Sequence, residues 1–153
     1  MLYASGPGGP VVVFLPGGGM TGLGYLNLHE QASRLTTSVL YDRAGTGWSD
    51  HVELPRSATE VTDELRSLLR VAGVPAPYVF VGHSLGGIYA RRFAQRFPAD
   101  VAGLATAALA RRPAGCSNSV AKALSNLAFW CTFVEMKPGR KPQNLRGIVR
   151  WCT

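Results

Sequence analysis

The chain has 153 residues, enough for one domain with a buried core, and its 46% apolar and 16% charged residues are typical of a soluble globular protein. The net charge is +7, and no apolar run approaches the roughly 18 residues that a membrane span needs. The first ten residues, MLYASGPGGP, lack the basic start and apolar stretch of a secretory signal, so a cytoplasmic location is expected.

The positive charge is confined to one end of the sequence. Residues 1–110 contain eight arginines, no lysine and eight acidic residues, whereas residues 111–153 hold eight basic residues against the single acid Glu135. We therefore expect a folded core over 1–110 and an atypical basic tail over 111–153, irregular, helical or disordered. A solvated tail explains this charge better than contacts with phosphate, so no nucleic-acid partner is expected.

The elements predicted in chain order alternate between strand and helix. Residues 57–73 form the clearest helix, with Ser57 as its N-cap, Glu60 three places on and Gly73 at its end. Buried strands are predicted at 11–15, 37–42 and 78–82, and further helices at 24–35 and 85–97. Residues 101–109 fit a fourth strand, although their alanines suit a helix better. This order predicts an α/β fold with a parallel sheet flanked by helices.

The segment GHSLG, Gly82 to Gly86, matches the G-x-S-x-G pattern of a nucleophile elbow. In this motif a strand turns sharply into a helix and exposes the serine, here Ser84, at the apex. Side chains at Gly82 and Gly86 would clash with the neighbouring strand and helix. The apolar run YVFV before the motif and the amphipathic helix after it provide the required setting.

Three segments together resemble the N-terminal half of an α/β-hydrolase fold protein: VVVFLPGGG at 11–19, VLYDRAGTGWSD at 39–50 and the stretch 78–104. The resemblance covers roughly residues 5–104 and implies an incomplete α/β-hydrolase-type sheet. It also implies a serine hydrolase of a small ester or related acyl substrate, with Ser84 as nucleophile. The backbone N–H groups of Leu85 and of Gly18, with Gly19 as the alternative, would form the oxyanion hole. A small-molecule substrate and no cofactor are implied, and the oligomeric state stays open.

The catalytic acid and base of such a site would follow the nucleophile along the chain. After Ser84 the sequence contains only Asp100 and Glu135 as acids, and no histidine. His29, His51 and His83 all precede or adjoin the serine, so no catalytic histidine is identified and the acid is unknown. Activity is therefore expected to be impaired, and a non-catalytic pseudo-hydrolase or truncated fragment is the alternative. One hypothesis is that residues from about 105 are read in a shifted frame, which translation of the DNA in the other two frames would test.

A rival interpretation uses the same glycines. Gly17, Gly19 and Gly22 form G-x-G-x-x-G after a strand, and Asp42 follows 20 residues later, as in dinucleotide-binding Rossmann-like domains. This interpretation leaves the Ser84 motif unexplained. Asp42 and Arg43 are otherwise expected to pair structurally at a strand end. The three cysteines form no C-x-x-C pattern, so no metal site is expected.

Overall fold

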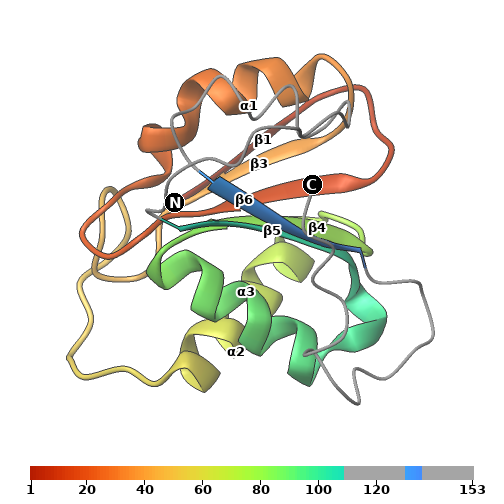
Figure 1. Ribbon diagram of the computed structural model, residues 1–153. Coiled ribbons are helices and arrows are strands. Elements are labelled where there is room, and N and C mark those ends of the chain that lie inside the picture. Colours follow the sequence, from red (N-terminus) through yellow and green to blue (C-terminus); the bar gives the residue numbers. More distant parts are fainter. Residues whose placement is uncertain (109–129, 136–153) are drawn as a thin grey trace.

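The computed structural model describes residues 1–108 and 130–135, which form a six-stranded sheet with helices on both faces (Figure 1). Short 3-10 turns lie at Gly22–Tyr25 and Pro98–Asp100. The helices are α1 (Leu26–Ser33), α2 (Ala58–Val71) and α3 (Leu85–Arg96). The strands are β1 (Leu2–Ser5), β2 (Val11–Leu15), β3 (Ser38–Tyr41), β4 (Tyr78–His83), β5 (Val101–Ala108) and β6 (Trp130–Glu135).

The sheet is parallel at its centre and antiparallel at both edges. Its strand order is β1-β3-β2-β4-β5-β6; β3, β2, β4 and β5 run parallel, while β1 and β6 run antiparallel to their neighbours. The predicted α/β class with a parallel sheet flanked by helices is confirmed, and the structure adds an antiparallel strand at each edge. The edge strand β1 was missed because it has only four residues and a half-exposed pattern, and its pairing with β3 decides its conformation.

Two segments after the third predicted strand form strands in the structure. Residues Val101–Ala108 form a strand rather than a helix, because they pair in parallel with β4, and Leu104 and Ala105 are buried. In the basic tail, Trp130–Glu135 is neither irregular nor helical but pairs antiparallel with β5. The other tail residues, 111–129 and 136–153, lie outside the described part of the chain, so the predictions made for them stay predictions.

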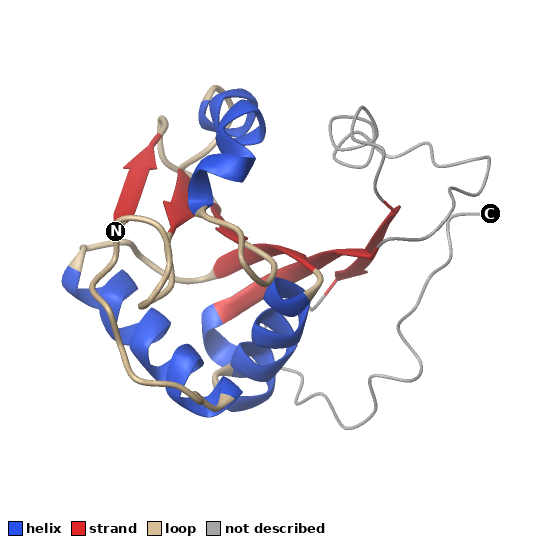
Figure 2. Cartoon of the chain, turned by 90° about the vertical axis from the view of Figure 1, so that its left-hand side faces the viewer, coloured by secondary structure: helices blue, strands red, loops and turns tan. Residues whose placement is uncertain are grey.

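Both faces of the sheet are covered, which explains the continuous apolar strands. Helix α1 lies on one face, and α2 and α3 lie on the other, as the two perpendicular views show (Figures 1 and 2). Phe14, Leu28 and Leu40 belong to the cluster on the α1 side. Phe80 and Phe93 belong to the larger cluster on the opposite side, with ring centroids 4.7 Å apart. The centre of the sheet, where β2 and β4 are neighbours, therefore has a buried apolar cluster on each face.

Helix α2 has the predicted capping box. The Ser57 hydroxyl oxygen accepts a hydrogen bond from the Glu60 amide at 3.2 Å, and the Ser57 amide donates to the Glu60 carboxylate at 2.7 Å. The pKa of Glu60 lies below its ordinary value, first because the Ser57 hydroxyl donates to the Glu60 carboxylate at 2.7 Å and second because the Ser57 amide donates to it as well. Gly73, with φ of +67°, follows the helix. In the described residues no helix is long and apolar enough to cross a membrane.

Candidate active site

Ser84 lies at the turn where β4 ends and α3 begins, and it is exposed to solvent. Its backbone has φ of 50° and ψ of −116°, a conformation that L-residues rarely adopt. Among the described residues it is the only one other than glycine with a positive φ. Such a conformation costs about 1–3 kcal/mol and persists only where the surrounding structure enforces it. This strained turn positions Ser84 at the carboxyl end of the central strand β4.

Two glycines allow this turn to pack closely. A Cβ at Gly86 would overlap the carbonyl oxygen of Leu15 and lie 2.7 Å from its carbonyl carbon. A Cβ at Gly82 would lie 2.7 Å from the backbone of Gly86 and of Gly87. Real Cβ atoms do not approach backbone this closely, so both positions require glycine. The first turn of α3 is thereby pressed against the end of β2.

The loop after β2 lies beside the residue that follows Ser84. A Cβ at Gly18 would be 3.8 Å from Cδ2 of Leu85, so these two residues are neighbours although Gly18 lies in a loop and Leu85 begins α3. The loop turns back through a hydrogen bond from the Met20 amide to the Gly17 carbonyl, at 3.3 Å. Gly18 and Gly19 are exposed, and Gly19 has φ of +69°. The structure thus brings the loop of Gly18 and Gly19 next to Leu85 and Ser84.

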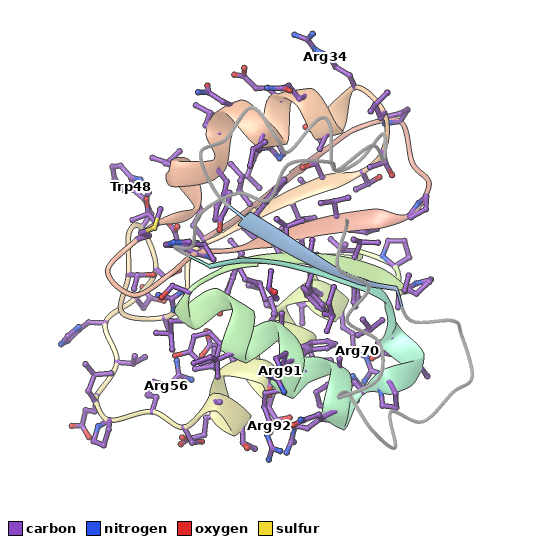
Figure 3. All side chains as sticks on the ribbon, in the orientation of Figure 1. Arg34, Trp48, Arg56, Arg70, Arg91 and Arg92 are labelled. Carbon is purple, nitrogen blue, oxygen red and sulfur yellow. The ribbon has the colours of Figure 1, made fainter. Side chains whose placement is uncertain are left out.

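The carboxylate of Asp42 organises two loops at this edge of the sheet. It is 1% exposed and accepts hydrogen bonds from the amides of Gly22, at 2.6 Å, and of Trp48, at 3.1 Å. A Cβ at Gly47 would lie 2.7 Å from the carboxylate carbon. The Trp48 side chain itself projects outward from its loop (Figure 3) and is 78% exposed. Asp42 therefore holds the backbone of both loops through hydrogen bonds.

Arg43 is also buried, and it holds the loop after β2. Its guanidinium donates to the carbonyl oxygens of Pro16 and of Gly17, the latter at 2.8 Å. The expected ion pair between Asp42 and Arg43 is absent from the described residues, since each side chain binds backbone instead. The expected role in structure is right and the expected partner is wrong. Nothing in the sequence pattern indicated these partners, which are 26 and 27 residues away.

The three histidines occupy different environments. His29, on α1, is 2% exposed; its Nδ1 lies 2.9 Å from the Ser38 hydroxyl and its Nε2 lies 3.2 Å from the Ser5 hydroxyl. Burial lowers the pKa of His29 from 6.5, and the nearby Glu30 opposes this shift. His51 is exposed in the loop after β3. His83 ends β4, and a Cβ at Gly17 would lie 2.8 Å from its Nδ1.

The two acids after Ser84 lie on different elements. Asp100 follows the far end of α3 and forms an ion pair with Arg66, with 2.7 Å between Oδ2 and Nε. Glu135 ends β6, and its side chain is not described. In the described part of the chain no three His, Cys, Asp or Glu side chains gather as a metal site would require.

The chain is similar to known hydrolases. A family model described as the alpha/beta hydrolase family matches residues 12–148, which extends well past residue 104. RutD of Azorhizobium caulinodans, a protein named for carbamate hydrolysis, is 35% identical over 99 residues, which are 65% of this chain and 37% of that protein. An AB hydrolase superfamily protein of Gibberella zeae is 46% identical over 59 residues, or 38% of this chain and 18% of that protein.

Solved structures show the same fold. An N-acyl homoserine lactone degrading enzyme superposes with a TM-score of 0.66 at 24% identity, over 70% of this chain and 40% of that one. A thermophilic esterase from Thermogutta terrifontis gives 0.66 at 22% identity, over 80% of this chain and 43% of that one. The chain therefore spans less than half the length of each of these relatives.

Proposed function

Because the chain belongs to the α/β-hydrolase family, we propose that Ser84 is the nucleophile of a serine hydrolase that acts on a small ester or related acyl substrate. The observation that carries this proposal is the backbone of Ser84, held at φ of 50° on the exposed turn between β4 and α3. A strained serine at the end of a central strand is the geometry of a nucleophile elbow. A serine at this position attacks a carbonyl carbon and forms an acyl-enzyme.

The proposed chemistry has two steps. In the first, the Ser84 oxygen bonds to the carbonyl carbon, its proton passes to a base, and the carbonyl oxygen becomes an oxyanion. The amide N–H groups of Gly18 and Leu85 stabilise that charge, with Gly19 as the alternative to Gly18. Collapse of the intermediate breaks the bond to the leaving group, which takes up the proton. In the second step water attacks the acyl carbon, the bond to the Ser84 oxygen breaks, and the acyl group leaves as a carboxylic acid while the Ser84 oxygen takes up a proton from the water.

The similar proteins support an acyl substrate. Their names refer to carbamate hydrolysis, lactone degradation and esterase activity, and each of these reactions breaks a bond at an acyl carbon. Ser84, Gly18 and Leu85 provide what this class needs for attack and for stabilising the oxyanion. The proposal therefore requires a small-molecule substrate and no cofactor.

The proposed activity of this chain is impaired, because the 153 residues contain no histidine after Ser84. Asp100, one of the two acids after Ser84, is paired with Arg66 beyond the far end of α3, about 12 residues of helix away at roughly 1.5 Å per residue. Without a base the serine is an ordinary alcohol of high pKa. The second candidate function, a non-catalytic pseudo-hydrolase or truncated fragment, rests on this same observation.

The dinucleotide-binding alternative has less support. It needs the Asp42 carboxylate to accept a hydrogen bond from a ribose. That carboxylate is 1% exposed and already accepts the amides of Gly22 and Trp48. Gly22, the third glycine of the proposed fingerprint, is itself one of these donors.

A fluorophosphonate probe tests the function directly, because it reacts covalently with activated serines. We expect slow labelling of the wild-type chain that disappears in Ser84→Ala. Ser67→Ala is the matched control, since Ser67 is an exposed serine on α2 and its removal should leave labelling unchanged. Circular dichroism confirms that each variant is folded. An unlabelled but folded wild-type chain would overturn the catalytic proposal and favour the non-catalytic one.

A further inference from the structure

The guanidinium of Arg43 is buried without a carboxylate partner among the described residues. Arg43 is 6% exposed, and the groups it contacts are the carbonyls of Pro16 and Gly17 and the ring face of Tyr89, 5.5 Å from the guanidinium carbon. Removing a cation from water costs several kcal/mol unless hydrogen bonds compensate. Here the compensation comes from the backbone of one short loop. The fold therefore places a positive charge directly behind that loop.

The Gly17 carbonyl accepts from Arg43 at 2.8 Å and from the Met20 amide at 3.3 Å, and its direction sets where the Gly18 amide points. The carbonyl of Gly17 and the N–H of Gly18 belong to the same planar peptide, and in a trans peptide they point in opposite directions. This peptide is trans, since the cis bonds in the described residues are at Pro55 and Pro77. Arg43 holds the carbonyl from the buried side at 2.8 Å. The Gly18 N–H is consequently turned away from Arg43, at an exposed position beside Leu85.

The same contact strengthens the Gly18 amide as a donor. A cation hydrogen-bonded to a carbonyl oxygen polarises the peptide and increases the positive charge on the N–H at its other end. Low solvent exposure enlarges this effect, because water does not screen the guanidinium. Arg43 can therefore raise the donor strength of Gly18 without touching a substrate.

Arg43 also connects the loop to the helix that begins after Ser84. Tyr89 stands four residues after Leu85 on α3, so both lie on the same side of the helix. The guanidinium contacts the Tyr89 ring and the Gly17 carbonyl at the same time. One side chain thus links the segment carrying the Gly18 amide to the helix carrying the Leu85 amide.

We propose that Arg43 is a positioning residue that orients and polarises the Gly18 amide and holds it in register with Leu85. The proposal deepens the proposed function, since these two amides are the donors of the suggested oxyanion hole. Its geometric part, the control of the Gly17–Gly18 peptide, can be measured whether or not the chain is an enzyme.

Nuclear magnetic resonance can measure hydrogen bonding at the peptide between Gly17 and Gly18. The 13C′ shift of Gly17 and the 15N shift of Gly18 both respond to hydrogen bonding at the Gly17 carbonyl. We expect both signals to move in Arg43→Met and to move less in Arg43→Lys, which keeps the charge and a donor. Arg66→Met is the matched control, because it removes a partly buried arginine of α2 that stacks on Phe97. Unchanged Gly17 and Gly18 signals in folded Arg43→Met would overturn the proposal.

Fluorophosphonate labelling separates this inference from the proposed function. If Ser84 is labelled, Arg43→Met should lower the labelling rate by about 10²-fold, the usual consequence of a misplaced catalytic group, and Arg43→Lys should recover part of the loss. If the wild type is not labelled but the Gly17 and Gly18 signals respond, the catalytic proposal fails and the positioning role stands. If labelling is retained while those signals do not respond, only the role of Arg43 fails.

If neither Arg43 variant folds, the rotation of the Arg43 guanidinium can be measured in the wild-type chain instead. A guanidinium held by two carbonyls rotates slowly, so the Nη protons of Arg43 should give separate, slowly exchanging signals. The exposed Arg91 and Arg70 provide freely rotating comparisons on α3 and α2 (Figure 3). An Arg43 guanidinium that averages like those two would contradict the proposal.

Discussion

Gly86 of α3 packs directly on Leu15 of β2, so closely that a Cβ at Gly86 would lie 2.7 Å from the Leu15 carbonyl carbon. Strand β2 ends where the loop of Gly17 and Gly18 begins, and α3 starts immediately after Ser84. The contact therefore sets how close the elbow comes to that loop. Any side chain at Gly86 would separate the two.

We expect Gly86→Ala to destabilise the fold by about 3 kcal/mol, because an added methyl group in a tightly packed site forces the backbone to shift. Gly87→Ala is the matched control. It lies one residue further along the same helix, and its Cβ would meet Thr106 Cγ2 at an ordinary 3.4 Å. Alanine also favours a helix over glycine by up to about 1 kcal/mol. Urea unfolding of both variants measures the difference, and equal stabilities would show that the Gly86 contact is not tight.

The carboxylate of Asp42 offers a second test, on stability. Asp42→Asn keeps the shape but replaces one acceptor oxygen with an amide group that faces an N–H donor. Since both Gly22 and Trp48 donate to this buried carboxylate, one of them would lose its partner, at a cost of about 1–3 kcal/mol. Asp50→Asn, at an exposed position of the same loop, is the control. A thermal melt of Asp42→Asn that matches the control would contradict the assigned role.

His29 should make the stability depend on pH. Burial lowers its pKa in the folded chain below 6.5, the ordinary value that the unfolded chain keeps. Between these two values the unfolded chain binds more protons, so the free energy of unfolding falls as the pH falls below about 6.5. Above that pH both states are neutral at this residue, and His29 contributes no slope.

Unfolding in urea at several pH values between about 7.5 and 5.5 measures this slope. We expect His29→Gln to flatten it, because glutamine does not titrate. Gln31→Asn, at an exposed position of the same helix, is a control that removes no titrating group and should leave the slope unchanged. A slope that persists in His29→Gln would assign the pH dependence to another group.

Much of the central fold could be predicted from local patterns. The apolar run at 11–15 became β2 with the same bounds, and the predicted helix at 57–73 became Ala58–Val71 with its Ser57 cap. The predicted helix at 24–35 proved shorter, Leu26–Ser33, because a 3-10 turn precedes it. Both edge strands escaped prediction, since β1 and the described strand β6 gain their hydrogen bonds from β3 and β5 rather than from their own sequence.

In the candidate site, the elbow pattern around Ser84 and the family could be recognised without the structure, because strand, sharp turn and helix are encoded by neighbouring residues. The sequence also places no histidine after Ser84. Two contacts become visible in the folded chain alone: Arg43 donates to the carbonyls of Pro16 and Gly17, and Gly18 lies beside Leu85. These contacts join residues 26 to 67 positions apart, and they form only when the sheet brings the ends of β2, β3 and β4 together. The periodicity of neighbouring residues does not indicate which distant residues meet, because those contacts depend on how the strands pack side by side.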